Sequence, residues 1–246
     1  MSASEHQRQI LENQRHWDAK PELRRIYRDF HRLLAENLSN VTGETVEIGS
    51  GIGNIREVIP ACVRTDLFEN PWIDRRENVY ALSMADRSVA NLILFDVFHH
   101  LEFPMAALRE CRRVLAPGGR LLVFDHAMSL SGAMFSKFVH HEKKGFMRSY
   151  SVDPERPSDW QEPRYYADHA NAHRFFVRRF DELLSDDWRQ SRVIQIPALE
   201  WLLSGGYRGP SLLSTVPPRV LAMAGRLAAN FPRVFALRLL VVLESK

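Results

Sequence analysis

An acid and three glycines share one short stretch of the chain, in the pattern Glu-x-Gly-x-Gly-x-Gly. The acid is Glu47, and the glycines are Gly49, Gly51 and Gly53. Glycine has no Cβ, so the backbone can turn sharply and a ligand can lie directly against it. A dinucleotide fingerprint would need another glycine where Asn54 stands. A carboxylate just before the turn suits a cationic, amine-bearing ligand. Without a ligand, the pattern would be only a tight strand-to-helix turn.

A second acid, Asp66, ends the next strand-like stretch of the chain and is followed by Leu67. A carboxylate at such a strand end can accept hydrogen bonds from both hydroxyls of a ribose. A lone acid at this place is otherwise a turn or helix cap. Taken together with the glycine turn, Asp66 predicts a nucleoside site.

Two adjacent histidines, His99 and His100, follow an apolar strand-like run that ends at Asp96. Imidazole has a pKa suited to general base catalysis near neutral pH. Asp125 ends a later strand-like run, and a carboxylate there can orient a histidine. These residues predict a base and its orienting acid. The alternative is that a histidine only packs against the ligand or hydrogen-bonds it.

The elements that would position these residues alternate between strand and helix from residue 44 onward. Apolar periodicity predicts strands at 44–48, 61–65, 78–82, 91–96 and 119–124, with later strands near 192–197 and 235–243. Helices are predicted at 53–59 and 104–115. This alternation favours an α/β fold, with a mostly parallel sheet covered on both faces. Ligands of such sheets bind at the carboxyl ends of the strands.

The rest of the chain is predicted to add helices around this core. Residues 5–38 read as two amphipathic helices, with Pro21 opening the second. We expect one domain over 1–246: N-terminal helices at 1–40, a ligand-binding core at 41–126, a lid insertion at 127–190, and the last strands at 191–246 with a helical insertion at 198–233. The two insertions would cap the substrate site, or serve as extra scaffold.

Composition excludes several classes of protein. The net charge of +3 is not gathered into the basic clusters of a nucleic-acid binder. Cys62 and Cys111 are too few for a disulfide scaffold or zinc site, and His169 and His173 lack further ligands, so no metal is predicted. No apolar run reaches the length of a transmembrane helix, and the N-terminus is polar. We therefore expect a cytoplasmic protein.

Four motifs in order resemble the class I methyltransferases that depend on S-adenosylmethionine (SAM), in the methyltransferase-11-type group that acts on small molecules. After the glycine turn and Asp66, the chain shows Asp-Val-Phe-His-His-Leu at 96–101 and Arg-Val-Leu-Ala-Pro-Gly-Gly at 113–119. The resemblance covers residues 44–125. It implies SAM as cofactor and a Rossmann-like, doubly wound seven-stranded sheet of order 3-2-1-4-5-7-6. The last strand would be antiparallel, formed by the run from Phe235 to Leu243.

The resemblance also implies a set of cofactor contacts. They are Glu47, Gly49, Ser50, Gly51, Gly53, Asn54, Asp66, Leu67, Leu82, Ser83 and Asp96. Relatives often carry an acid after the third strand that contacts the adenine amine, but the stretch 78–84 has none. We therefore expect backbone groups near Leu82 and Ser83, with apolar packing by Met84 and Leu67, to hold the adenine.

The expected reaction is methyl transfer to a small-molecule hydroxyl, with His99 or His100 as base and Asp125 orienting it. The alternatives are N- or C-methylation by alignment without a base, or a SAM-fold subunit that binds without catalysis. Base methylation of nucleic acids is disfavoured, because residues 96–99 do not form an Asn/Asp-Pro-Pro-aromatic element.

The two insertions indicate the kind of acceptor. They are rich in Leu, Phe, Trp and Tyr and also in Arg, which suits an amphipathic acceptor such as a sugar, a lipid-linked molecule or a polyketide-like one. The apolar run from Val220 to Ala229 would contact a membrane surface or pack on the sheet. The sequence does not indicate an oligomeric state.

Overall fold

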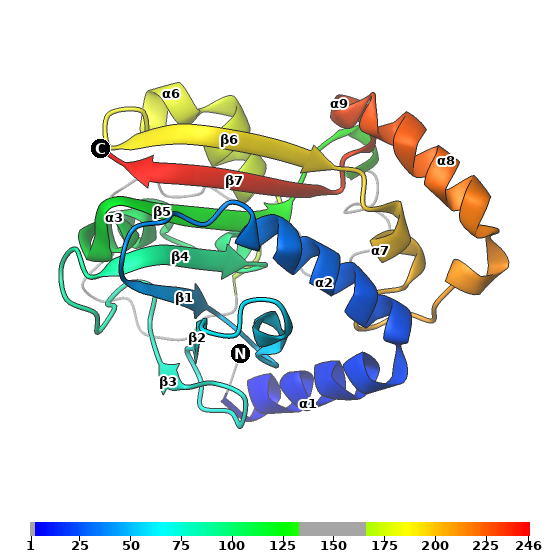
Figure 1. Cartoon of the computed structure of the whole chain (residues 1–246), viewed down its shortest axis with the longest axis horizontal. Helices are drawn as coiled ribbons and strands as arrows, with labels where there is room; N and C mark the ends of the chain where they lie inside the picture. The colour runs from blue at the N-terminus through cyan, green and yellow to red at the C-terminus, as the bar shows by residue number, and fades with distance from the viewer. Residues whose placement is uncertain (1–2, 133–165) are drawn as a thin grey trace.

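Seven strands form one sheet in the computed structural model, which describes residues 3–132 and 166–246. Their order across the sheet is β3-β2-β1-β4-β5-β7-β6 (Figure 1). The strands are β1 (Glu44–Ile48), β2 (Val63–Asp66), β3 (Arg75–Arg76), β4 (Val89–Phe95), β5 (Leu115–His126), β6 (Trp188–Ile196) and β7 (Arg238–Ser245). Strands β1 to β5 pair in parallel, and β7 runs antiparallel to both β5 and β6. The predicted order and the antiparallel last strand are confirmed.

The third strand lies earlier in the chain than predicted. Arg75 and Arg76 pair with the end of β2, whereas the predicted strand 78–82 forms a turn. Within that turn the backbone N–H of Tyr80 donates to Asn78 Oδ1 at 3.0 Å, and that of Ala81 donates to the Asn78 carbonyl at 2.8 Å. An asparagine that hydrogen-bonds its own following backbone stabilises a turn in place of a strand.

The helices are longest at the N-terminus. They are α1 (Ala3–Ala19), α2 (Pro21–Ala35), α3 (Pro104–Val114), α5 (Asn171–His173), α6 (Phe180–Leu183), α7 (Leu199–Leu203), α8 (Pro218–Ala229) and α9 (Pro232–Phe235). Pro21 opens α2, as predicted, because its fixed φ suits a first helical position. The helix predicted at 53–59 is a short 3₁₀ helix, Asn54–Glu57.

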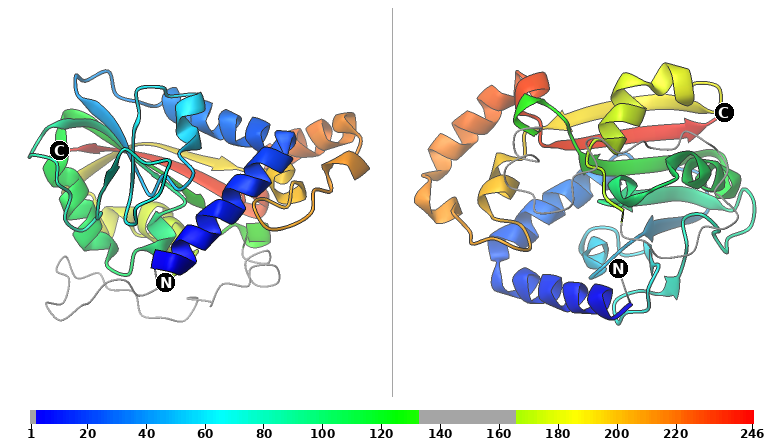
Figure 2. Two further views of the ribbon diagram at one scale, coloured as in Figure 1. Left: turned by 90° about the horizontal axis from the view of Figure 1, so that it is seen from below. Right: turned by 180° about the vertical axis from the view of Figure 1, so that it is seen from behind.

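Alternate residues of the central strands enter two separate cores. Ile93 of β4 and Leu122 of β5 pack with α2, whereas their neighbours Leu94 and Val123 pack with α3 on the opposite face. Because both faces are covered, β4 is buried along its whole length. The two views in Figure 2 show α2 and α3 on opposite sides of the sheet.

The connection from β5 to β6 differs in part from the lid expected over 127–190. Phe175, Phe176 and Leu184 are buried, and both phenylalanine rings contact Phe98. Burial of apolar side chains is favourable, so these residues lie in the core on one face of the sheet and not over its carboxyl edge. These side chains of the predicted lid pack in the core on the α3 face of the sheet, and its residues 133–165 lie outside the described residues.

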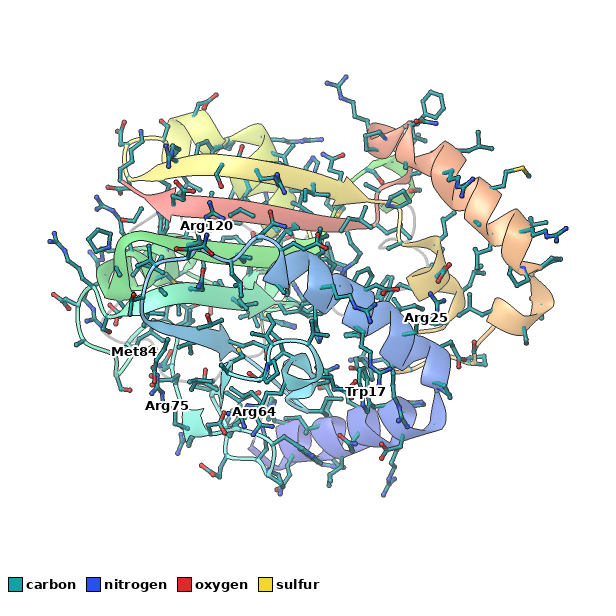
Figure 3. All side chains as sticks on the ribbon, viewed as in Figure 1. Trp17, Arg25, Arg64, Arg75, Met84 and Arg120 are labelled. Carbon is teal, nitrogen blue, oxygen red and sulfur yellow. The ribbon has the colours of Figure 1, made fainter. Side chains whose placement is uncertain are left out.

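The insertion between β6 and β7 places α7, α8 and α9 beyond the carboxyl ends of the parallel strands (Figure 1). Arg25 of α2 forms an ion pair with Glu200 of α7, and Arg25 faces that helix in Figure 3. The Lys20 ammonium donates to the carbonyls of Ser204, Gly206 and Gly209. The N-terminal helices thus hold the insertion in place. Within the described ranges, no helix is long and apolar enough to cross a membrane.

Candidate functional site

Two adjoining cavities open at the carboxyl edge of the sheet, where the candidate residues were expected. The larger has a volume of about 800 Å³ and the smaller about 300 Å³. Gly49, Gly51, Asp96 and His100 border both cavities. The glycine turn therefore lies where the two cavities meet.

The three glycines of the turn all have positive φ, between 53° and 75°. A Cβ on Gly49 would lie 2.5 Å from Val97 Cγ2, and one on Gly53 would lie 2.7 Å from the Trp72 carbonyl oxygen. A Cβ on Gly51 would meet nothing within 4 Å. Gly49 and Gly53 are therefore required by close packing, and Gly51 leaves its face open to a ligand.

Glu47 is a buried carboxyl group on the wall of the larger cavity. Its Oε2 atom has no hydrogen-bond partner among the described residues. Burial raises the pKa of Glu47 to about 7, although a hydrogen bond from Ser50 opposes the shift. A buried acceptor without a donor suits a ligand that brings a donor, and an ammonium group is the best of these.

Asp66 borders the smaller cavity, as does Leu67. Its Oδ2 accepts the backbone N–H of Gly51 at 3.1 Å, which joins the ends of β1 and β2. The Nε2 of His6 lies 3.2 Å from Asp66 Oδ1.

Helix α1 covers these cavities, a role that sequence reasoning missed. Gln9 and Asn13 border both cavities, while His6 and Ile10 border the smaller one. These residues recur at helical spacing on one face of α1. The mixture of polar and apolar residues on that face is the sequence feature that could have predicted its contact with the cavities.

Leu82 and Ser83, expected at the adenine, border neither cavity. Their backbone N–H groups donate to Glu110 and Glu77, each at 2.8 Å, and the Leu82 side chain lies in the core. Because β3 is displaced, residues 77–80 border the smaller cavity instead. Gly53 also borders neither cavity, whereas Ser50 and Asn54 border the larger one.

His99 and Asp125 meet as predicted. His99 Nδ1 lies 2.9 Å from Asp125 Oδ1, and the His99 backbone N–H donates to Oδ2 at 3.0 Å. Both residues are buried, and His99 borders the larger cavity. His100 Nδ1 instead lies 2.9 Å from the Tyr166 carbonyl oxygen. Asp125 therefore contacts both the ring and the backbone of His99, whereas the ring of His100 contacts the backbone of Tyr166.

His126 joins this pair and was missed from the sequence, although it directly follows Asp125. Its Nδ1 lies 3.0 Å from Asp125 Oδ1. Burial lowers the pKa of His126 well below its usual range. Burial would raise the pKa of Asp125, but the flanking His99 and His126 hold it well below its usual value. Among the described residues, His99, His126 and His169 bring ring nitrogens within 4.8 Å of one another.

Asp96 directly follows β4 in the left-handed region, with φ 57°, and pairs with Arg238 at the start of β7. The Arg238 guanidinium lies 4.8 Å from the Phe124 ring centroid and 5.0 Å from that of Trp201. Arg238 is buried and borders the larger cavity. This ion pair joins the end of β4 to the start of β7 beside Trp201 of the insertion, and sequence reasoning missed it.

Comparison with known families identifies the kind of domain that carries these cavities. Residues 46–123, about a third of the chain, match a family model described as a methyltransferase domain. These residues form a methyltransferase domain, and the fold around them is that of SAM-dependent methyltransferases. No curated protein sequence matches this methyltransferase.

Solved structures share the fold across nearly the whole methyltransferase. A SAM-dependent methyltransferase from Archaeoglobus fulgidus is 14% identical with TM-score 0.51, covering 91% of this chain and 94% of that one. A protein from Thermotoga maritima, titled a possible histamine N-methyltransferase, is 12% identical with TM-score 0.53, covering 96% and 98%. A geranyl diphosphate methyltransferase solved with SAM is 13% identical with TM-score 0.51, covering 89% and 85%. At these identities the likeness shows the fold alone.

The residues of this methyltransferase's cavities fit the cofactor. The open face of Gly51, the unpartnered Oε2 of Glu47 and the carboxylate of Asp66 lie along one edge of the sheet. SAM is an amine-bearing nucleoside with a cationic sulfur, so it needs an acid at its amine, a carboxylate at its ribose and room at the backbone between them.

Proposed function

We propose that this methyltransferase transfers the methyl group of SAM to a hydroxyl of a small amphipathic acceptor, with His99 as the base. The observation that carries the proposal is the pairing of His99 with Asp125 on the wall of the larger cavity. An ionised carboxylate at Nδ1 keeps the proton there and leaves Nε2 as the atom that accepts one.

The cofactor is proposed to lie across both cavities. Its methionine end would lie in the larger cavity, with its amine near Glu47 and the rest of the amino-acid group against the protein backbone at 49–51. Its ribose would be held by Asp66 and its adenine by residues 77–80 and Leu67 in the smaller cavity. Asn78 stands where relatives often carry an acid, and its amide oxygen can also accept a hydrogen bond from the adenine amine.

SAM supplies an activated methyl group on a sulfonium, so the protein has to align the acceptor and take up its proton. Alignment of reacting groups is the larger contribution, and general base catalysis adds about 10²- to 10⁴-fold. His99 would take the hydroxyl proton, and Asp125 would stabilise the resulting imidazolium. His100, held by the Tyr166 carbonyl, would position the acceptor.

The walls of the larger cavity support an amphipathic acceptor. Beyond His99 it is bordered by Tyr27, Phe95, Trp201 and Tyr207, together with leucines of the insertion. Arg208 also borders this cavity, as does the ion pair of Arg238 with Asp96. Aromatic walls with a few polar groups select a ligand that is apolar over most of its surface.

Transfer of the labelled methyl group from SAM to a panel of alcohols, phenols, sugars and amines tests the proposal, with the methylated atom identified by NMR. We expect O-methyl products. His99→Gln and Asp125→Asn should lower kcat by about 100-fold or more and remove the acidic limb of the kcat–pH profile. His100→Gln is the matched comparison and should mainly raise KM.

N-methyl or C-methyl products, with near-normal kcat in both histidine variants, would show instead that the enzyme works by alignment without a base. Binding of S-adenosylhomocysteine by each variant provides the control for folding and cofactor affinity.

A further inference from the structure

Helices α8 and α9 present an apolar surface to the outside of the molecule. Among the described residues, seven of the eleven exposed large apolar side chains lie in this part of the chain: Leu212, Val220, Met223, Leu227, Phe231, Val234 and Phe235. Met223, Leu227 and Phe231 are each more than half exposed, at 58%, 57% and 59%. Exposed apolar side chains gathered in one place mark an interaction surface.

This surface is not the side on which α8 packs. Leu221 and Ala228 are the buried residues of α8, and they attach the helix to the rest of the protein. Val220, Met223 and Leu227 recur at helical spacing on a different side. Figures 1 and 2 show α8 at the outer end of the molecule, beyond the carboxyl ends of β1 and β4.

A stripe of arginines borders the apolar side chains. Arg219, Arg226 and Arg233 are exposed and seven residues apart, which places Arg219 and Arg226 on one side of α8, next to Val220 and Leu227. Residues 201–243 contain no Asp or Glu, so no acid within this segment offsets the charge. A cationic stripe beside an apolar stripe is the pattern of a helix that lies in the interface of an anionic bilayer.

We propose that the surface formed by 212–235 docks on an anionic phospholipid membrane. The apolar side chains would enter the boundary between headgroups and acyl chains, and the three arginines would contact lipid phosphates. Pairing with a second copy of the chain fits less well. A symmetric contact through α8 would bring two arginine stripes together without acids to neutralise them.

Docking would place the larger cavity at the membrane surface. Leu212 belongs both to the exposed surface and to the wall of that cavity, and Gly209 is close by on the same wall. If the proposed methyl transfer holds, an acceptor embedded in the membrane would then reach His99 without crossing water. Membrane binding itself does not require that reaction.

Co-sedimentation with vesicles tests the proposal in the absence of any acceptor. Full-length protein is mixed with vesicles of phosphatidylcholine alone or of phosphatidylcholine with phosphatidylglycerol. We expect binding to the anionic vesicles that weakens with added salt. Replacing all three arginines (R219Q, R226Q and R233Q) should weaken it about 100-fold, at roughly fivefold per arginine. The variant M223S with L227S should weaken it by about tenfold or more.

Matched controls separate the surface from general charge and exposure. One control variant combines R8Q, R15Q and R109Q, which removes three exposed arginines elsewhere on the protein. A second control, V193S, removes an exposed apolar side chain on β6. These variants should bind like the unaltered protein. Equal loss in the control and test variants, no binding to anionic vesicles, or a dimer that M223S with L227S dissociates would each overturn the proposal. Failure of methyl transfer alone would leave it standing.

Discussion

The substitution Glu47→Gln should stabilise the cofactor-free protein while weakening SAM binding. Glu47 is 3% exposed, and its pKa is raised from 4.5 to about 7 because burial penalises the charged form. At about 1.4 kcal/mol per pKa unit, ionised Glu47 costs about 3 kcal/mol of folding free energy. Glutamine has nearly the same shape and carries no charge, so the variant avoids this cost.

The cost of Glu47 depends on pH in a definite direction. Below pH 4.5 the carboxyl group is protonated in both the folded and the unfolded chain, so Glu47 costs no folding free energy. As the pH rises towards 7, the unfolded chain releases this proton first, so the folded state becomes less stable. Above pH 7 the loss is complete. The free energy of unfolding of Glu47→Gln should therefore exceed that of the unaltered protein by about 1 kcal/mol at pH 5 and about 3 kcal/mol at pH 8.

Urea denaturation at both pH values measures these differences, and calorimetric titration with SAM measures binding. Losing one hydrogen bond between a carboxylate and an ammonium should weaken SAM binding by about 10- to 100-fold. Glu44→Gln, at an exposed acid of the same strand, is the control and should change neither quantity. A Glu47→Gln protein that is less stable than the unaltered protein at pH 8 would show that ionised Glu47 costs no folding free energy, and normal SAM binding would show that Glu47 does not hold the amine.

Three further predictions follow from the site. Gly51→Ala should abolish SAM binding and cost about 1 kcal/mol of stability, because alanine disfavours the positive φ at this position. Gly53→Ala should lose clearly more stability, because its Cβ would also meet the Trp72 carbonyl oxygen. Calorimetry measures SAM binding and urea denaturation measures stability, and equal stability losses in the two variants would contradict the prediction. Lys20→Met should lower the free energy of unfolding by about 2 kcal/mol, because three carbonyls of the insertion lose a charged donor; an unchanged urea midpoint would contradict this. If His99 is a base, dialysis against EDTA should leave turnover unchanged. Added Zn²⁺ should then inhibit the enzyme by binding His99, His126 and His169. Activity that is lost on dialysis and restored by a metal would instead assign these histidines to a metal site.

Local signals in the sequence predicted the arrangement of the sheet and part of the site. The fully buried β4 reads as an unbroken apolar run, and residues at the ends of neighbouring parallel strands meet at one edge, which brought His99 to Asp125. The third strand was misplaced because Val79 and Leu82 are apolar, as strand residues are. They enter the core from a turn that Asn78 stabilises through its side chain.

Other parts of the site depend on contacts between distant segments, for which one sequence carries little signal. Arg238 pairs with Asp96, which lies 142 residues earlier, and nothing near either residue indicates the other. The cover formed by α1 was missed because Gln9 and Asn13 resemble the solvated face of a surface helix. For α8 the sequence left two expectations open; Met223 and Leu227 are exposed and so do not pack on the sheet, and membrane contact stays a proposal.

A crystal structure with S-adenosylhomocysteine bound would decide whether His99 can act as the base, because it shows the position of the sulfur that carried the methyl group. We expect the adenine in the smaller cavity beside residues 77–80, the ribose on Asp66, and the sulfur facing His99 across the larger cavity. A sulfur that faces away from His99, with Asp125 and its histidines out of reach of any acceptor bound there, would contradict the assignment of His99 as the base.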